Sequence, residues 1–463
     1  MRDHYKVLVT IVLFFSVAIR LLLYWVNPPG NSFDNHFEPI FMIMNTGCTP
    51  AKDACFQCYH PPVFYWISAL VGDSAKNFGL TLNGLTKLLQ FLPCLYGVLS
   101  LWVWYLIAEK LPLSGFARFF AFAAACILPR HVYMSAMNSN DTLSYLLVSV
   151  CVYLLLVIVE ERLSVRKLAA LSVAITLAVF TKYTAFAILP TACAVFAAAF
   201  SRRLIQRSKR NCLLVCIAFL LPLTMLTSYM VHNTRRYGTA LPWNVTLYDP
   251  SVDRPRDPGG ISFVTFKPWE EIEAPILAPG RLNSFWTMLY GGMWFDTEPY
   301  FVSYLDTDSG WWDRYYDWYR GKGAFPGENH GQSRITRWCG SSLETLGLVP
   351  LALVMIGLCR YFRGKKAFLA ESAARTEVVL TLLPLLFLCN AAGIVALTLK
   401  LPVYNSIKAS YLLNSVPFFM VFMGFGAGWA EKSRIGTVTV PVCIGLLFLF
   451  SLVHFTHFIY MMI

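Results

Sequence analysis

Apolar stretches of about 20 residues recur along the whole chain between short charged clusters, and this pattern limits the fold more than any other feature. A helix of that length crosses the hydrocarbon core of a bilayer. Only 14% of the 463 residues are charged and 57% are apolar, whereas a soluble domain carries about a quarter charged residues. The pattern predicts an all-α polytopic membrane protein and excludes a soluble globular enzyme or a disordered chain.

We predict about eleven membrane-spanning helices from these stretches. They are expected near residues 7–26, 86–108, 115–131, 142–159, 166–181, 184–200, 212–231, 343–360, 377–399, 412–430 and 436–460. The run Val63–Val71 is too short to span and is predicted to be a juxtamembrane helix on the outer surface. No small-residue cleavage site follows the first helix, so that helix is expected to be a retained anchor.

The expected helices divide the chain into three parts. Residues 1–231 form a transmembrane module that includes a first outer loop at 27–85. Residues 232–342 form one large outer loop, and residues 343–463 form the C-terminal transmembrane helices. The connections on the other side are short and leave no room for a nucleotide-binding domain, and the chain has no glycine-rich phosphate loop.

Lysine and arginine gather in one set of short connections, for example at 202–210 and 360–375. Cytoplasmic loops carry the Lys/Arg excess, so the N-terminus is predicted to be cytoplasmic and the C-terminus outside. This sidedness accounts for the net charge of +12, and nucleic-acid binding has no support.

Four of the 13 cysteines are expected on the outer side, namely Cys48, Cys55, Cys58 and Cys339. An oxidising compartment permits disulfides there, and four cysteines allow three connectivities. The spacing of Cys55 and Cys58, with His60 nearby, also fits part of a zinc site, but no second ligand pair is evident. We favour disulfides or free thiols and predict no cofactor, while a divalent metal ion is not excluded.

Charged side chains at membrane depth are costly and face a cavity or a partner. The ones that the cytoplasmic face does not explain are Arg20, Asp34, Glu38, Arg130, His131, Asp141, Lys182, Arg235, Arg236, Lys400 and Lys408. All are expected at or just inside the outer boundary. Acids and bases from distant parts of the chain therefore share one depth, which fits a site that holds an anion beside a general base.

Most of the candidate acids and bases lie in four short segments, which are 31–39, 59–66, 128–143 and 180–185. Each segment also has an ordinary structural interpretation. An acid at a helix start is commonly an N-cap, and a His-Pro-Pro sequence commonly begins a helix. A single lysine between two apolar spans commonly extends its ammonium group to the interface between membrane and water.

The order of these segments, followed by the sequence 408–413, resembles the GT-C membrane glycosyltransferases. The resemblance is to the protein O-mannosyltransferase and lipid A aminoarabinose transferase branch, and it covers the chain to about residue 240. It implies an inverting transferase of the GT-C fold that moves a sugar from a dolichyl- or undecaprenyl-phosphate donor to an acceptor hydroxyl. The acceptor is a protein, a lipid or a glycan. The membrane is the plasma membrane of a bacterium or archaeon or the endoplasmic reticulum, with the site on the outer or lumenal face.

The resemblance also implies roles for particular residues. Asp34 matches the catalytic carboxylate, and Lys182 matches the lysine that contacts the lipid-linked phosphate. Asp141 matches the second acid of the family, which organises the site. Because Asp34 is followed by asparagine, Glu38 either positions the acceptor or takes over as base. The other residues expected to bind the donor phosphate are His60, Arg130, Arg236 and Lys408.

The chemistry of such a reaction agrees with these residue types. Cations stabilise the charge that develops on the leaving phosphate, and a carboxylate accepts the proton of a poorly nucleophilic hydroxyl. The alternatives are a transporter or flippase for a lipid-linked or anionic substrate, and a structural or receptor-like protein. Transporters commonly show repeated halves that meet at the midplane, and neither feature is visible here. A receptor-like protein leaves the gathered acids and bases unexplained.

Overall fold

The computed structural model describes residues 3–29, 36–161, 163–243, 261–269, 284–295, 334–363, 375–400 and 407–462, and the single residues 314, 317 and 323. Within these ranges the regular elements are helices, and no strand occurs. The predicted all-α fold is thereby confirmed.

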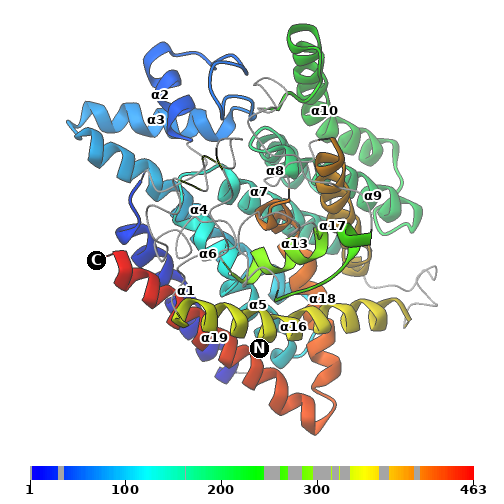
Figure 1. Cartoon of the computed structure of the whole chain (residues 1–463). Coiled ribbons are helices and arrows are strands. Elements are labelled where there is room, and N and C mark those ends of the chain that lie inside the picture. Colours follow the sequence, from blue (N-terminus) through cyan, green and yellow to red (C-terminus); the bar gives the residue numbers. More distant parts are fainter. Residues whose placement is uncertain are drawn as a thin grey trace.

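Figure 1 shows the helices packed around one another, with α2 and α3 at the top left and α16 and α19 at the bottom. The α-helices are α1 (Asp3–Val26), α2 (Phe37–Thr46), α3 (Val63–Asn77), α4 (Leu82–Lys110), α5 (Gly115–Cys126), α6 (Pro129–Ser135), α7 (Asp141–Glu160), α8 (Val165–Val179), α9 (Ile188–Ser201), α10 (Lys209–Tyr237), α13 (Phe285–Trp294), α16 (Arg334–Arg363), α17 (Arg375–Lys400), α18 (Val416–Ala430) and α19 (Arg434–Met462). The 3₁₀ helices are η1 (Tyr183–Ala187), η3 (Ile261–Val264) and η5 (Ala409–Ser415).

In the described part of the chain, nine helical stretches are long and apolar enough to cross a membrane. They are α1, α4, α7, η1 with α9, α10, α16, α17, η5 with α18, and α19. The chain is therefore an integral membrane protein. Two further predicted spans correspond to α5 with 12 residues and α8 with 15 residues. Both are shorter than the roughly 20 residues of a crossing helix, so the count of eleven and the sidedness stay predictions.

Two helix ends explain why α5 and α8 are short. Pro129 follows α5 closely, and a residue before proline is disfavoured in helical conformation, so Leu128 turns away and Pro129 starts α6. At the end of α8 the chain becomes extended at Lys182, with φ −155° and ψ 144°, before η1 begins. Each break places polar residues among apolar helices.

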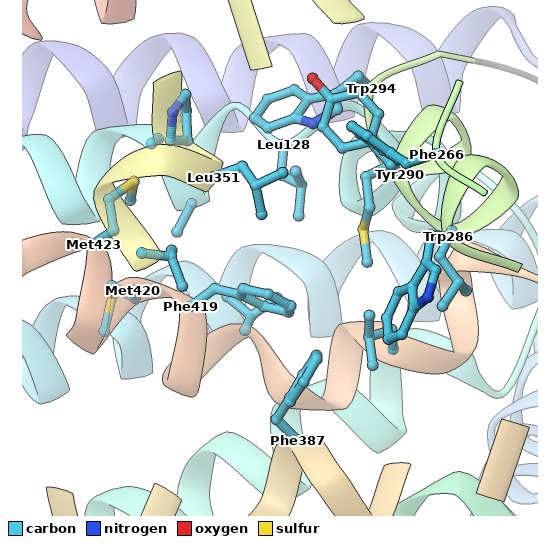
Figure 2. Close-up of a pocket in the computed structure, with 18 residues that line it drawn as sticks. Leu128, Phe266, Trp286, Tyr290, Trp294, Leu351, Phe387, Phe419, Met420 and Met423 are labelled. Carbon is cyan, nitrogen blue, oxygen red and sulfur yellow. The ribbon is translucent and has the colours of Figure 1, made fainter. Parts of the chain in front are cut away.

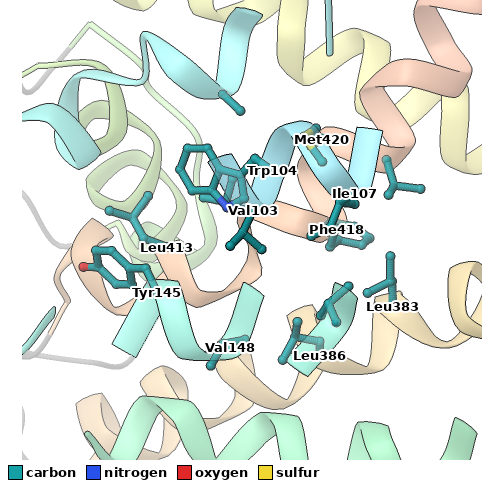
Figure 3. Close-up of a cluster of buried hydrophobic side chains, with 14 of the residues drawn as sticks. Val103, Trp104, Ile107, Tyr145, Val148, Leu383, Leu386, Leu413, Phe418 and Met420 are labelled. Atoms are coloured by element: carbon teal, nitrogen blue, oxygen red, sulfur yellow. The ribbon is translucent and has the colours of Figure 1, made fainter. Parts of the chain in front are cut away.

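The core lies where α4, α7, α17 and α18 meet, and Figure 3 shows its side chains. Trp104 of α4 is fully buried there, and its indole nitrogen donates a hydrogen bond of 2.9 Å to the Ser149 hydroxyl of α7. Elsewhere α16 and α18 approach closely at Gly357 and Gly426, where an added Cβ would collide with the other helix. Small residues allow such close approach between membrane helices.

Helix α13 comes from the segment 232–342, which the sequence predicts to be an outer loop. It packs against α6, α16 and η5, and its Phe285 and Trp294 side chains are buried. At least this part of the segment lies inside the helical bundle. The predicted juxtamembrane run forms α3, which packs on α2 and α4.

Candidate active site

A buried ion pair joins two residues that the sequence predicts to share one site. The ammonium of Lys182 lies 2.6 Å from Oδ1 of Asp141, and both side chains are almost inaccessible to solvent. The hydroxyl of Tyr145 donates to the same carboxylate oxygen at 3.0 Å and approaches the carbonyl of Ser410 at 2.8 Å. One carboxylate oxygen therefore holds both a lysine and a tyrosine in place.

Local structure brings Asp141 and Lys182 together. Asp141 is the first residue of α7, and Lys182 is the extended residue between α8 and η1. The side-chain amide of Asn140, at the N-cap of α7, donates to the carbonyl of Thr181 at 3.1 Å. This bond ties the start of α7 to the break after α8, so the pair depends on the contact between these two elements.

The C-terminal part of the chain completes this pair. Lys408 is extended in front of η5, just as Lys182 is extended in front of η1. Within η5 the ring of Tyr411 lies under the Lys182 ammonium, with 5.3 Å between the nitrogen and the ring centroid. The amide of Asn414 donates to the Thr184 hydroxyl at 2.8 Å. The two lysine-bearing segments are thus packed together.

A third segment, before α3, adds further basic groups. The Lys52 ammonium donates to the carbonyl oxygen of His60 at 2.7 Å, and the rings of His36 and His60 are stacked with centroids 5.6 Å apart. The amide of Val63 donates to the carbonyl of Phe180 at 2.9 Å, which ties the start of α3 to the break after α8. We call Lys52, His60, Lys182 and Lys408 the basic cluster.

Burial and like charges disfavour protonation within the basic cluster. Burial lowers the pKa of His60 well below its usual range, and the charges of Lys182 and its basic neighbours lower it further. Burial also lowers the pKa of Lys52 to about 7. Binding of an anion would favour the protonated forms of both groups. The cluster is therefore suited to an anionic ligand.

The sequence did not single out Lys52 and His36. A lysine in a Cys-rich segment gives no sign of burial by itself, and His36 lies next to a segment with stronger motifs. Lys52 lies close in sequence to His60, and His36 lies close to Glu38. This nearness to candidate residues of the first outer loop is the signal that could have identified them. The burial of both residues depends on how the first outer loop packs against α3, which the sequence alone does not show.

Cys55 and Cys58 form a disulfide between Lys52 and His60. Its Cα–Cα distance is 5.0 Å, and both cysteines are buried. Cys48 is exposed and Cys339 buried, and neither is paired in a disulfide. Within the described ranges no group of three or more His, Cys, Asp or Glu side chains is placed to hold a metal ion.

Two other predicted residues lie in different surroundings. Arg130 is fully buried in α6, and its Nε donates to the Gly292 carbonyl of α13 at 2.6 Å. Arg236 is exposed in the last turn of α10, with its guanidinium over the ring of Tyr237. Their part in donor binding stays a prediction.

The two remaining predicted acids belong to the first outer loop. Asp34 lies outside the described residues, so its role stays a prediction. Glu38 is exposed in the first turn of α2 and lines a groove that also contains Asn138. It is therefore available to a ligand in that groove.

An apolar cavity of about 340 Å³ lies beside η5, and Figure 2 shows the side chains around it. Its walls come from α5, α13, α16, α17, η5 and α18. Trp286 and Trp294 of α13 face Phe419 and Met423 of α18 across it. Leu412, which also lines the cavity, directly follows Tyr411 of the Lys182 contact. Segment η5 thus contributes both to the Lys182 contact and to the lining of the apolar cavity.

Part of the chain resembles a family of membrane glycosyltransferases. Residues 59–227 match the family model of dolichyl-phosphate-mannose-protein mannosyltransferases, and this segment contains His60, Asp141 and Lys182. The resemblance predicted from the sequence is confirmed over this segment. No curated protein sequence matches the chain.

Several solved structures match this chain over most of its length. The oligosaccharyltransferase of Archaeoglobus fulgidus, complexed with Zn and sulfate, has 12% identity over 96% of this chain and 53% of its own, with a TM-score of 0.49. The archaeal oligosaccharyltransferase AglB from Archaeoglobus fulgidus, with an inhibitory peptide and a dolichol-phosphate, has 13% identity over 96% of this chain and 55% of its own, with a TM-score of 0.48. ArnT from Cupriavidus metallidurans, bound to undecaprenyl phosphate, has 16% identity over 92% and 78%, with a TM-score of 0.35. This chain spans about half the length of the oligosaccharyltransferase.

Proposed function

We propose that the protein is an inverting glycosyltransferase that moves a sugar from a polyprenyl-phosphate donor to an acceptor hydroxyl. One observation carries the proposal. The buried pair of Lys182 and Asp141 lies among further basic groups, and η5, which contacts Lys182, also lines an apolar cavity; a lipid-linked phosphate requires both kinds of surroundings. The family match over 59–227 supports the same class of reaction.

The basic cluster is the proposed seat of the donor phosphate. Breaking the bond between sugar and phosphate leaves additional negative charge on the phosphate, and fixed cations stabilise that charge as it develops. Lys182 and Lys408 supply ammonium groups from two segments that pack together, and Lys52 adds a third when it is protonated. Asp141 orients the Lys182 ammonium through their direct contact.

The apolar cavity is the proposed seat of the first prenyl units. Its lining contains tryptophan, phenylalanine and methionine side chains and includes Leu412 of η5, the residue after Tyr411. Methionine adapts its shape to irregular apolar ligands, and burial of each CH₂ group contributes about 0.8 kcal/mol. The lipid tail thereby fixes the phosphate near Lys182.

Asp34 is the proposed general base, on the basis of the resemblance. The acceptor oxygen forms a bond to the anomeric carbon while its proton passes to the Asp34 carboxylate. The bond between the anomeric carbon and the phosphate oxygen breaks, and the lipid phosphate leaves with the electron pair. One direct displacement inverts the anomeric centre. Asp141 is a positioning residue, because its Oδ1 already accepts from Lys182 and Tyr145.

The proposed site faces the outer or lumenal side of the membrane. Two observations support this side: the lysine and arginine clusters of the opposite connections, and the disulfide between Cys55 and Cys58 beside the site. The three parts 1–231, 232–342 and 343–463 act together, since α13 and Lys408 come from the second and third.

The proposal is tested with Asp34→Asn in purified protein, supplied with a radiolabelled polyprenyl-phosphate sugar that the wild type uses. We expect transfer to fall by about 10²-fold or more, because general-base catalysis contributes that much. Binding of the donor should stay unchanged. Glu38→Gln, measured in parallel, shows whether Glu38 rather than Asp34 accepts the proton of the acceptor. Full transfer by Asp34→Asn would contradict the assignment of the base.

A further inference from the structure

A large groove with both polar and apolar lining residues is separate from the residues assigned to the donor above. Its volume is about 1110 Å³, slightly above the range of about 300–1,000 Å³ that is usual for small-molecule sites. The groove lies between the end of α1, α2 and the start of α4. Its lining includes Phe37, Glu38, Phe41, Asn45, Lys87 and Asn138.

Asn138 in this groove has unused hydrogen-bonding capacity. The residue is only 1% exposed, yet neither the oxygen nor the nitrogen of its amide has a hydrogen-bond partner among the described residues. A buried polar group without a partner is energetically unfavourable. Such a group needs an explanation, and here the groove that it lines supplies one. A ligand that both donates and accepts hydrogen bonds would satisfy the amide.

The groove is not built for an anion. Lys87 is its only cation among the described lining residues, and the three protons of this ammonium are already used. They are donated to the carbonyls of Tyr24 and Asn27 and to Oε1 of Gln90. The remaining charged group is the Glu38 carboxylate. A phosphate would therefore meet a negative charge and no available cation.

From this chemistry we propose that the groove binds a neutral sugar unit of the acceptor, so that the acceptor is a glycan. The proposal rests on the transfer reaction proposed above. Sugar hydroxyls both donate and accept, as the amides of Asn138, Asn45 and Asn83 require. The apolar faces of a sugar ring pack against aromatic rings such as Phe37 and Phe41, which also line the groove.

The position of the groove fits an acceptor better than the donor. The donor's phosphate and tail are assigned to the basic cluster and to the cavity beside η5, and no residue of either lines the groove. Asn138 nevertheless precedes Asp141 by three positions, so one end of the groove lies close in sequence to the buried ion pair. Glu38 lies along the same groove, where it can bind a hydroxyl.

The test measures binding of two ligands to full-length protein in nanodiscs. One ligand is a methyl glycoside disaccharide from a neutral panel, and the other is undecaprenyl phosphate. Asn138→Ala should weaken binding of the glycoside about tenfold, because it removes two hydrogen bonds from a buried site, and should change undecaprenyl phosphate binding less than twofold. Thr86→Ala, on α4, should weaken glycoside binding in the same way by a smaller factor. Asn77→Ala, an exposed asparagine outside the groove, should change neither.

Unchanged glycoside binding in Asn138→Ala and Thr86→Ala overturns the proposal. Equal loss of both ligands also overturns it, because the groove would then not be separate from the donor site. A third contrary result is transfer to an unglycosylated Ser/Thr peptide that no glycoside inhibits. If the wild type binds the glycoside but not undecaprenyl phosphate, the proposed donor is wrong while the sugar site stands.

Discussion

Lys182 and Asp141 are buried together, so each charge depends on the other for its stability. A buried pair contributes little net stability, but removal of one partner leaves an uncompensated charge. From the sequence alone, Asp141 also fits a helix N-cap and Lys182 a snorkelling lysine. Their membership of one site could be predicted from the family order. Their direct contact could not, because it depends on how α7 packs against the break after α8.

Lys182→Ala should lower the free energy of unfolding by about 3–5 kcal/mol, because Asp141 is then left buried and unpaired. Adding Asp141→Asn should recover most of this loss but not the binding of donor. Thermal unfolding and donor binding measure the two effects. Lys167→Ala breaks a more exposed pair with Glu161 and should leave the free energy of unfolding nearly unchanged. Equal stability of Lys182→Ala and wild type would show that the pair is not a buried one.

Lys52 makes donor binding depend on pH. Its pKa of about 7 means that the free protein protonates this lysine as the pH falls from 8 to 6. The proposed donor is a phosphodiester whose charge does not change in this range, so its affinity should rise as the pH falls. Burial keeps the pKa of His60 well below 6.5, so this histidine does not titrate here.

Lys52→Met should remove this pH dependence and leave affinity near the value of the wild type at pH 8. Donor binding measured between pH 6 and 8 checks this expectation. The exposed Lys76 of α3 offers a matched control, and Lys76→Met should keep the slope of the wild type. A slope that survives in Lys52→Met would assign the titration to another group.

At the scale of elements, two short 3₁₀ helices present the lysines of the site. Both η1 and η5 follow an extended lysine and continue directly into a membrane helix. The boundary between the predicted spans 166–181 and 184–200 locates Lys182 correctly between two helices. The break at 127–129 was not predicted, because the residues 115–131 read as one apolar stretch. Pro129 is the sequence feature that could have predicted the break. It disfavours a helical conformation at Leu128, and α5 therefore ends before this residue.

The apolar cavity makes a prediction for α5. Ala124 is buried and lines the cavity, so Ala124→Leu should exclude part of the prenyl chain. We expect the KM for an undecaprenyl donor to rise about tenfold, since each excluded CH₂ group costs about 0.8 kcal/mol. The KM for a donor with a two-unit prenyl chain should change less.

The exposed Ala170 of α8 provides the control for this prediction. Ala170→Leu adds the same volume away from the cavity and should leave the KM for both donors unchanged. A KM that rises equally for short and long donors in Ala124→Leu would mean that the cavity does not hold the tail.

For the whole molecule, the candidate site is assembled from distant parts of the chain. Asp141 and Lys182 come from the N-terminal module, and Lys408 comes from the C-terminal helices. The sequence could predict this gathering at one depth, because charged residues at membrane depth face a common cavity. It could not predict the cavity or the groove, since both are spaces between helices whose packing no local pattern records. The packing of α13 against α6, α16 and η5 could not be predicted for the same reason.

The central claim concerns transfer of a sugar from a lipid-linked phosphate. The most direct measurement supplies the purified wild type with a panel of radiolabelled polyprenyl-phosphate sugars and a mixture of glycan, lipid and peptide acceptors. We predict that one donor loses its label to an acceptor, with inversion at the anomeric carbon and release of the polyprenyl phosphate. Translocation of these lipids across a liposome membrane, without transfer from any donor, would instead identify a transporter and contradict the account.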